Sequence, residues 1–114
     1  MTAIKEYVRP DGTCPFGRWF DRLNAEAAAR VVTAKARLQT GRGDLKPVGE
    51  GVSELRIDFG PGYRVYFGKD GDDVVVLLVG GTKKTQRRDI AFAKELWREY
   101  KAIKKAAAER RGKK

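Results

Sequence analysis

The side chains of this sequence that are best suited to chemistry are cationic, and they gather in two short segments. Arg56 and Arg64 stand in neighbouring stretches of alternating polarity, while Lys83 and Lys84 follow a run of aliphatic residues. Fixed cations can bind a polyanion and stabilise negative charge that builds up during a reaction. Exposed arginines on a strand are more often part of an ordinary solvated surface than of a functional site. The elements that position them decide between these two interpretations.

The residue types that are missing narrow the chemistry further. The chain has no histidine and a single cysteine, Cys14. This composition excludes an internal disulfide, the usual zinc sites, a histidine general base, and Ser-His or Cys-His nucleophile pairs. We interpret Cys14 as a structural thiol, because no histidine is present to activate it. Any catalysis would have to use Arg, Lys, Glu, Asp, Tyr or Gln, and the sequence predicts neither a metal nor a cofactor.

Positive charge is concentrated towards the C-terminus. The chain carries a net charge of +10; residues 1–82 hold 12 basic and 11 acidic residues (net +1), whereas residues 83–114 hold 13 and 4 (net +9). This asymmetry favours a nucleic acid over a membrane as the partner, because the basic end lacks a large apolar face. Since we find no signal-peptide pattern and no apolar run of membrane-spanning length, we expect a cytoplasmic protein.

The order of the elements predicts an α+β fold. Hydrophobic periodicity and turn residues place strands at 4–8, 52–59, 63–67 and 74–79, and helices from 15, over 25–40 and over 86–108. The order β-α-α-β-β-β-α predicts a curved, mainly antiparallel four-stranded sheet with helices packed mainly on one side. We read residues 41–51 as a loop, residues 1–108 as one domain and residues 109–114 as a basic tail. We expect the basic segment from Lys104 to Lys114 to be frayed when free.

Strand alternation then places the cations on one face of that sheet. Leu55 and Ile57 alternate with Arg56, which therefore points away from the core. If Val65 joins the apolar face across the hairpin, Arg64 and Tyr66 lie on the same side as Arg56. We expect these side chains to be exposed and ringed by the basic residues that follow the last strand.

Several sequence blocks resemble one known family. They are Pro15-Phe16 with Trp19, Gly43-Asp44, Lys46 to Val52, Glu54-Leu55-Arg56-Ile57, Gly60-Pro61-Gly62-Tyr63-Arg64-Val65-Tyr66, and Gly80-Gly81 with Lys83, Gln86, Asp89 and Ile90. Over residues 3–105 the chain resembles the HigB-like "addiction module killer" branch of the RelE/ParE superfamily. The resemblance implies a RelE-like fold and the toxin of a type II toxin–antitoxin system, which cleaves mRNA on the ribosome without a metal. It also implies a small antitoxin, of helix-turn-helix type, as partner, with operator DNA bound only through that antitoxin.

The resemblance assigns roles to the basic residues. Arg56 and Arg64 would stabilise the phosphate under attack, and Lys83 or Lys84 would move protons, so these four are the candidate catalytic residues. Glu54 is a weaker candidate base or a partner that balances Arg56. The candidate RNA-binding residues are Tyr66, Gln86, Arg87 and Arg88; Tyr66 would stack on a base or be an ordinary exposed tyrosine.

Departures from the family pattern leave two alternatives open. The chain has no histidine, Ile90 stands where RelE has a tyrosine, and Thr82 stands where members of this branch commonly have an aspartate. The first alternative is a ParE-like inhibitor of DNA gyrase without nuclease activity, because the fold alone does not fix the function. The second is a decayed toxin that only binds its antitoxin.

Overall fold

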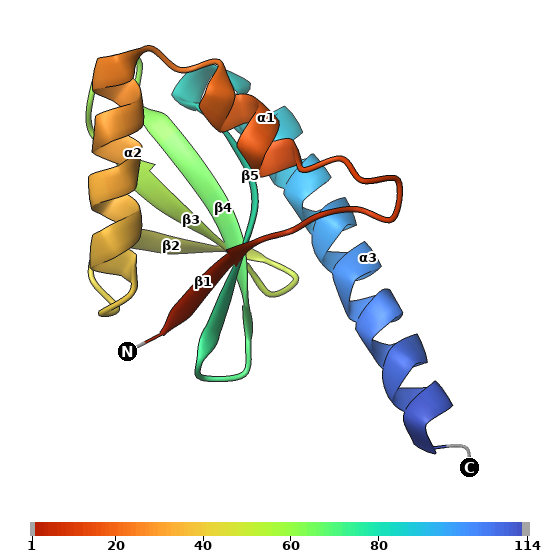
Figure 1. The fold of residues 1–114 in the computed structure, drawn as a ribbon. Coiled ribbons are helices and arrows are strands. Elements are labelled where there is room, and N and C mark those ends of the chain that lie inside the picture. The colour runs from red at the N-terminus through yellow and green to blue at the C-terminus, as the bar shows by residue number, and fades with distance from the viewer. Residues whose placement is uncertain (1, 113–114) are drawn as a thin grey trace.

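The computed structural model of the protein describes residues 2–112 and forms one mixed β-sheet with helices on both sides (Figure 1). The elements in chain order are β1 (Ala3–Glu6), α1 (Pro15–Asp21), α2 (Ala25–Leu38), β2 (Asp44–Gly49), β3 (Val52–Ile57), β4 (Tyr63–Asp70), β5 (Val74–Thr82), the 3-10 turn η1 (Lys83–Thr85) and α3 (Gln86–Gly112). The strand order is β1-β5-β4-β3-β2. Only the β1–β5 pair is parallel within the described residues, which confirms the predicted α+β class and mainly antiparallel sheet.

The sheet has five strands, so the prediction of four was wrong. The additional strand is β2, which pairs antiparallel with β3 in the segment predicted to be a loop. β2 is exposed along most of its length and contains Pro47, so it lacks the alternation that marks a half-buried strand. Glu50 and Gly51 connect it to β3 in a two-residue turn, and both have the positive φ angles (54° and 83°) that favour a tight hairpin.

The helices cover both faces of the sheet, which corrects the prediction that they pack mainly on one side. Phe16 of α1 and Val31 of α2 pack with Leu77 of β5 in one core cluster, whereas Leu96 of α3 packs with Leu78 of β5 in the other. Figure 1 shows α2 and α3 on opposite sides of the sheet. The unbroken aliphatic run of β5 agrees with this arrangement, because a strand buried on both faces has no polar side.

Two glycines let the tryptophans lie directly against the sheet. A Cβ atom at Gly80 would lie 2.1 Å from the ring of Trp19 in α1, and one at Gly68 would lie 2.6 Å from the ring of Trp97 in α3. Each helix therefore rests on a strand position that has no side chain. The close packing fixes α1 and α3 at defined places over the two faces.

The helix boundaries follow local sequence signals. Pro15 begins α1, and Asn24 caps α2 by accepting a hydrogen bond from the backbone N–H of Ala27 at 2.8 Å, as predicted. α3 continues to Gly112, beyond the predicted end at residue 108, so the segment from 104 to 112 is helical rather than frayed. The last two residues of the predicted tail lie outside the described residues. No helix in the described range is long and apolar enough to cross a membrane.

Candidate functional site

Arg56 and Arg64 lie directly opposite each other on adjacent strands. They are cross-strand partners in the β3–β4 pair, and Glu54 and Tyr66 are partners two residues further along. All four side chains lie on the sheet face that α3 covers, so the predicted common side for Arg56, Arg64 and Tyr66 is confirmed. Like charges placed opposite each other on a sheet repel. Nearby acidic side chains are therefore needed to offset the repulsion between Arg56 and Arg64.

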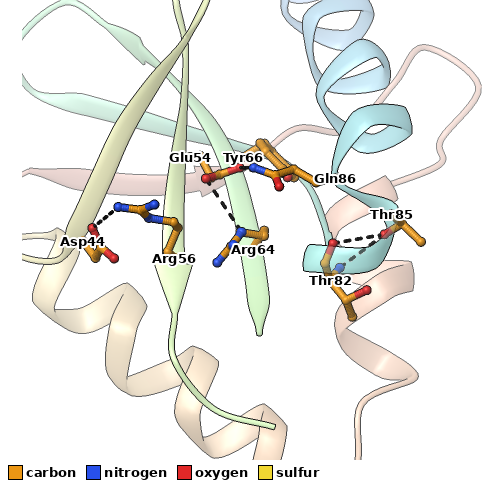
Figure 2. A network of polar contacts seen from close by, with 8 residues as sticks. All are labelled: Asp44, Glu54, Arg56, Arg64, Tyr66, Thr82, Thr85 and Gln86. Atoms are coloured by element: carbon orange, nitrogen blue, oxygen red, sulfur yellow. Dashed lines mark hydrogen bonds and ion pairs between the residues drawn. The ribbon is translucent and has the colours of Figure 1, made fainter. Parts of the chain in front are cut away.

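Glu54 is the centre of a buried polar network (Figure 2). Its side chain is fully buried, and Oε2 accepts hydrogen bonds from the Tyr66 hydroxyl at 3.2 Å and from Nε2 of Gln86 at 2.7 Å. Oε1 lies 3.7 Å from Nε of Arg64. A buried carboxylate needs such partners because desolvation of an unpaired charge is costly. Gln86, at the start of α3, therefore ties the helix to the sheet at this point.

Arg64 is not the exposed side chain that alternation predicted. Only 11% of its side chain is accessible, because α3 packs over the face that we expected to be open. Its ion pair with Glu54 is made through Nε, and no hydrogen bond engages its terminal nitrogens within residues 2–112. An unpaired nitrogen that was buried would count among the buried atoms without a partner, and the terminal nitrogens do not, so they are in contact with solvent. The guanidinium is thus held at its base and open at its tip.

Tyr66 is fully buried, which contradicts the expectation of an accessible ring. Burial raises the pKa of its hydroxyl, and the nearby charge of Glu54 raises it further. The phenol therefore stays protonated and donates its hydrogen bond to Glu54. Because the ring packs in the core beneath α3, it offers no free surface on which a base could stack.

Arg56 has a different acidic partner from the one considered from the sequence. Its Nη2 donates to Oδ1 of Asp44 in β2 at 2.9 Å, and 38% of its side chain remains accessible. Glu54 instead balances Arg64. Asp44 was not expected as this partner, because no hydrophobic period marks β2 in the sequence and only the β2–β3 pairing places Asp44 opposite Arg56.

Three buried polar atoms in this cluster have no hydrogen-bond partner: Oε1 of Glu54, Nε of Arg56 and Nε of Arg64. Among residues 2–112, these three are all of the buried side-chain nitrogen and oxygen atoms without a hydrogen-bond partner. Buried polar groups are nearly always paired in folded proteins, so a group of exceptions at one place needs an explanation. Oε1 of Glu54 and Nε of Arg64 face each other at 3.7 Å as the two ends of the ion pair. An anion could bridge the two neighbouring arginines only through their terminal nitrogens.

The lysines lie at the rim of the cluster, on the turn that leads into α3. Lys83 and Lys84 are exposed in η1, and the backbone N–H of Lys83 donates to the carbonyl of Gly62 at 2.8 Å, so the turn lies against the β3–β4 hairpin. Thr82 and Thr85 form a capping box that fixes the turn (Figure 2). The lysines therefore stand beside the hairpin that carries both arginines.

The remaining predicted residues separate into two groups. Gln86 joins the buried network, whereas Arg87 and Arg88 are exposed on the first turn of α3. Nε of Arg88 lies 3.6 Å from Oδ1 of Asp89 and borders a different groove, between α1 and α3. Across residues 2–112 no group of three or more acidic or cysteine side chains lies close enough together to hold a metal ion. Burial raises the pKa of the Cys14 thiol, which keeps it protonated.

The protein has an α+β fold in which Arg56 and Arg64 lie opposite each other beside a buried glutamate network. Residues 18–110 match the family model described as "Phage derived protein Gp49-like (DUF891)". The chain is also 46% identical over 89 residues to an uncharacterized protein of Haemophilus influenzae, a match that covers 76% of this chain and 90% of the relative. The protein therefore belongs to the Gp49-like family, which is related to the HigB-like addiction-module toxins that the sequence resembles.

Proposed function

We propose that the protein is the toxin of a type II toxin–antitoxin pair and that it cleaves mRNA on the ribosome without a metal ion. The observation that carries the proposal is the pair of opposed arginines, Arg56 and Arg64, in which Glu54 holds Nε of Arg64 and the terminal nitrogens of Arg64 stay in contact with solvent. Placing two guanidinium groups side by side costs repulsion in the free protein. A bound phosphate would remove that cost and accept hydrogen bonds from the terminal guanidinium nitrogens. The resemblance to HigB-like toxins makes RNA the favoured source of that phosphate.

In the proposed reaction the 2′-oxygen of a ribose attacks the adjacent phosphorus, and the bond from phosphorus to the 5′-oxygen of the next nucleotide breaks. A proton leaves the 2′-hydroxyl and another reaches the departing 5′-oxygen, so the products are a 2′,3′-cyclic phosphate and a 5′-hydroxyl. Negative charge grows on the phosphoryl oxygens during the attack. Arg56 and Arg64 would stabilise it, a contribution of the kind that dominates many enzymatic rate enhancements.

Glu54 acts in this proposal as a positioning residue rather than as a base. It is fully buried and accepts hydrogen bonds from Tyr66 and Gln86, and it holds Arg64 by its Nε. This arrangement fixes the direction of the guanidinium before substrate binds, which lowers the cost of reorganisation in the transition state. It leaves the terminal nitrogens of Arg64 for the phosphate.

Lys83 and Lys84 are the proposed proton carriers. Both are exposed at the rim of the site, on a turn held against the hairpin. Ile90, at the position where RelE has a tyrosine, packs against the core cluster beneath α3 and offers no proton. The proposed site therefore relies on lysine amines for proton transfer.

The activity is tested by adding the purified protein to a translating extract and mapping cuts in a reporter mRNA. Arg56→Ala should lower the cleavage rate by on the order of 10²-fold or more, the usual loss when one charge-stabilising group is removed. Arg42→Ala is the matched control, because this exposed arginine lies outside the cluster. Equal cleavage by the Arg56 variant and the control would overturn the assigned site. A wild type that cuts nothing but inhibits gyrase supercoiling would favour the ParE-like function instead.

The proposed partners are a small antitoxin, mRNA and the ribosome. If the protein is a toxin, its expression alone should stop growth, and co-expression of the product of a neighbouring small gene should restore it. Harmless expression of the wild type at high level would contradict toxicity and favour a decayed toxin that serves only as a binding module.

A further inference from the structure

A second cationic hollow lies between α1 and the first turns of α3, outside the arginine–glutamate cluster. It is a groove of about 440 Å³. Arg18, Trp19 and Arg22 form one wall, Arg88 and Phe92 form part of the other, and the end of β5 forms the floor. Figure 1 shows α1 beside the N-terminal part of α3, where this groove lies. None of the catalytic roles proposed above uses the α1 wall.

The charges in the groove are only partly compensated. Arg9 pairs with Glu99 at 3.0 Å, and Arg88 lies 3.6 Å from Asp89. Arg18 and Arg22 are exposed, and neither has an acidic partner or a side-chain hydrogen bond among residues 2–112. Lying four residues apart, these two cations repel each other. The groove therefore presents two free guanidinium groups on one wall.

The groove adjoins the arginine–glutamate cluster. Gly81 lies on its floor and is also the cross-strand partner of Arg64. The exposed residues Lys83 and Lys84 occupy the turn that follows β5 and precedes the helical wall of the groove. Cationic residues therefore occur in the site, in the groove and on the turn that links β5 to α3.

We propose that this groove binds the sugar–phosphate backbone of the RNA that flanks the scissile bond, with Arg18 and Arg22 on neighbouring phosphates. The inference rests on the proposed function, because the groove continues the site assigned to the scissile phosphate. Guanidinium forks match phosphate oxygens in pairs, and the partly buried rings of Trp19 and Phe92 give an apolar edge for the ribose. The continuity with Arg64 favours RNA over an acidic protein segment.

The test measures binding of a short single-stranded RNA with 2′-O-methyl riboses, which keeps every phosphate but cannot be cleaved. The double variant Arg18→Ala/Arg22→Ala should weaken binding by on the order of tenfold and reduce the slope of log Kd against log salt by about 1.4, since each lost single-strand phosphate contact removes about 0.7. The control Arg42→Ala/Lys69→Ala removes the same net charge from exposed positions outside the groove.

The outcomes separate the groove from the nuclease. Weaker binding and a reduced salt slope in the Arg18/Arg22 variant, but not in the control, support the groove even if the wild type cleaves no mRNA. An equal loss of RNA affinity in the Arg18/Arg22 variant and in the control would show that only net charge matters, and would overturn the inference. Unchanged RNA affinity of the Arg18/Arg22 variant would also overturn the inference, but would leave the proposed nuclease activity untouched. If that variant binds RNA normally and an antitoxin more weakly, the groove binds an acidic protein instead. Melting temperatures within a few degrees of the wild type are the folding control, because both arginines are exposed.

Discussion

Removal of Arg64 should destabilise the fold, although strand alternation suggested an exposed side chain. In Arg64→Ala the fully buried carboxylate of Glu54 loses its only cationic partner in the described part of the chain. Breaking a buried ion pair from one side costs about 3–5 kcal/mol. We expect about 3 kcal/mol, the lower end of that range, because Tyr66 and Gln86 still donate to Glu54. For a chain of this length that corresponds to a fall in Tm of about 12 °C.

A double-mutant cycle isolates the cause of this loss. Glu54→Gln removes the charge but keeps the size of the side chain, so Glu54→Gln/Arg64→Ala should regain about 2 kcal/mol relative to Arg64→Ala alone. Urea unfolding of the wild type, both single variants and the double variant gives the coupling energy. If Arg64→Ala changes stability by less than about 0.5 kcal/mol, as an ordinary surface substitution does, or if the two changes simply add, the buried ion pair is not what stabilises this site.

Two other features of the fold give predictions of the same kind. Hydrogen bonds from Arg9 and Tyr7 lower the pKa of Glu99 below its ordinary 4.5, so its contribution is complete above that pH and is lost as the pH falls through the lowered value. Glu99→Gln should therefore flatten the decline of Tm below about pH 4.5; an equally steep decline would contradict the contribution of this carboxylate. Gly80→Ala should cost about 1–3 kcal/mol by overpacking, because its Cβ would lie 2.1 Å from the ring of Trp19. A melting temperature equal to that of the wild type would contradict the tight packing of Trp19 in α1 against this glycine.

The sequence predicted the common face of Arg56, Arg64 and Tyr66 because alternation along a strand is a local property. It did not predict which helix would cover that face. An amphipathic helix shows that it has a buried side, but its pattern does not say against which face of the sheet that side packs. With α3 on the face of the arginines, Tyr66 is fully buried and Arg64 is only partly accessible, and Glu54 is the centre of a network rather than an exposed acid.

The partner of Arg56 could not be predicted for a different reason. Asp44 belongs to an edge strand that is exposed and contains Pro47, so no hydrophobic period marks it. Its place opposite Arg56 depends on pairing with β3, which is a tertiary property of the sheet. Lys83 and Lys84 follow the last strand as predicted, but that strand does not end at the paired glycines: β5 runs through Gly80 and Gly81 to Thr82, because these residues still pair with β4.

The chemistry of the RNA ends tests the central claim most directly. The wild-type protein is incubated with translating ribosomes, and the termini of the cut mRNA are identified by mass spectrometry. Stabilisation of a phosphate by Arg56 and Arg64 during attack by the neighbouring 2′-oxygen predicts 2′,3′-cyclic phosphate and 5′-hydroxyl ends, which Arg56→Ala should reduce by on the order of 10²-fold. Ends that carry a 5′-phosphate and a 3′-hydroxyl, or intact mRNA together with inhibited gyrase, would contradict it.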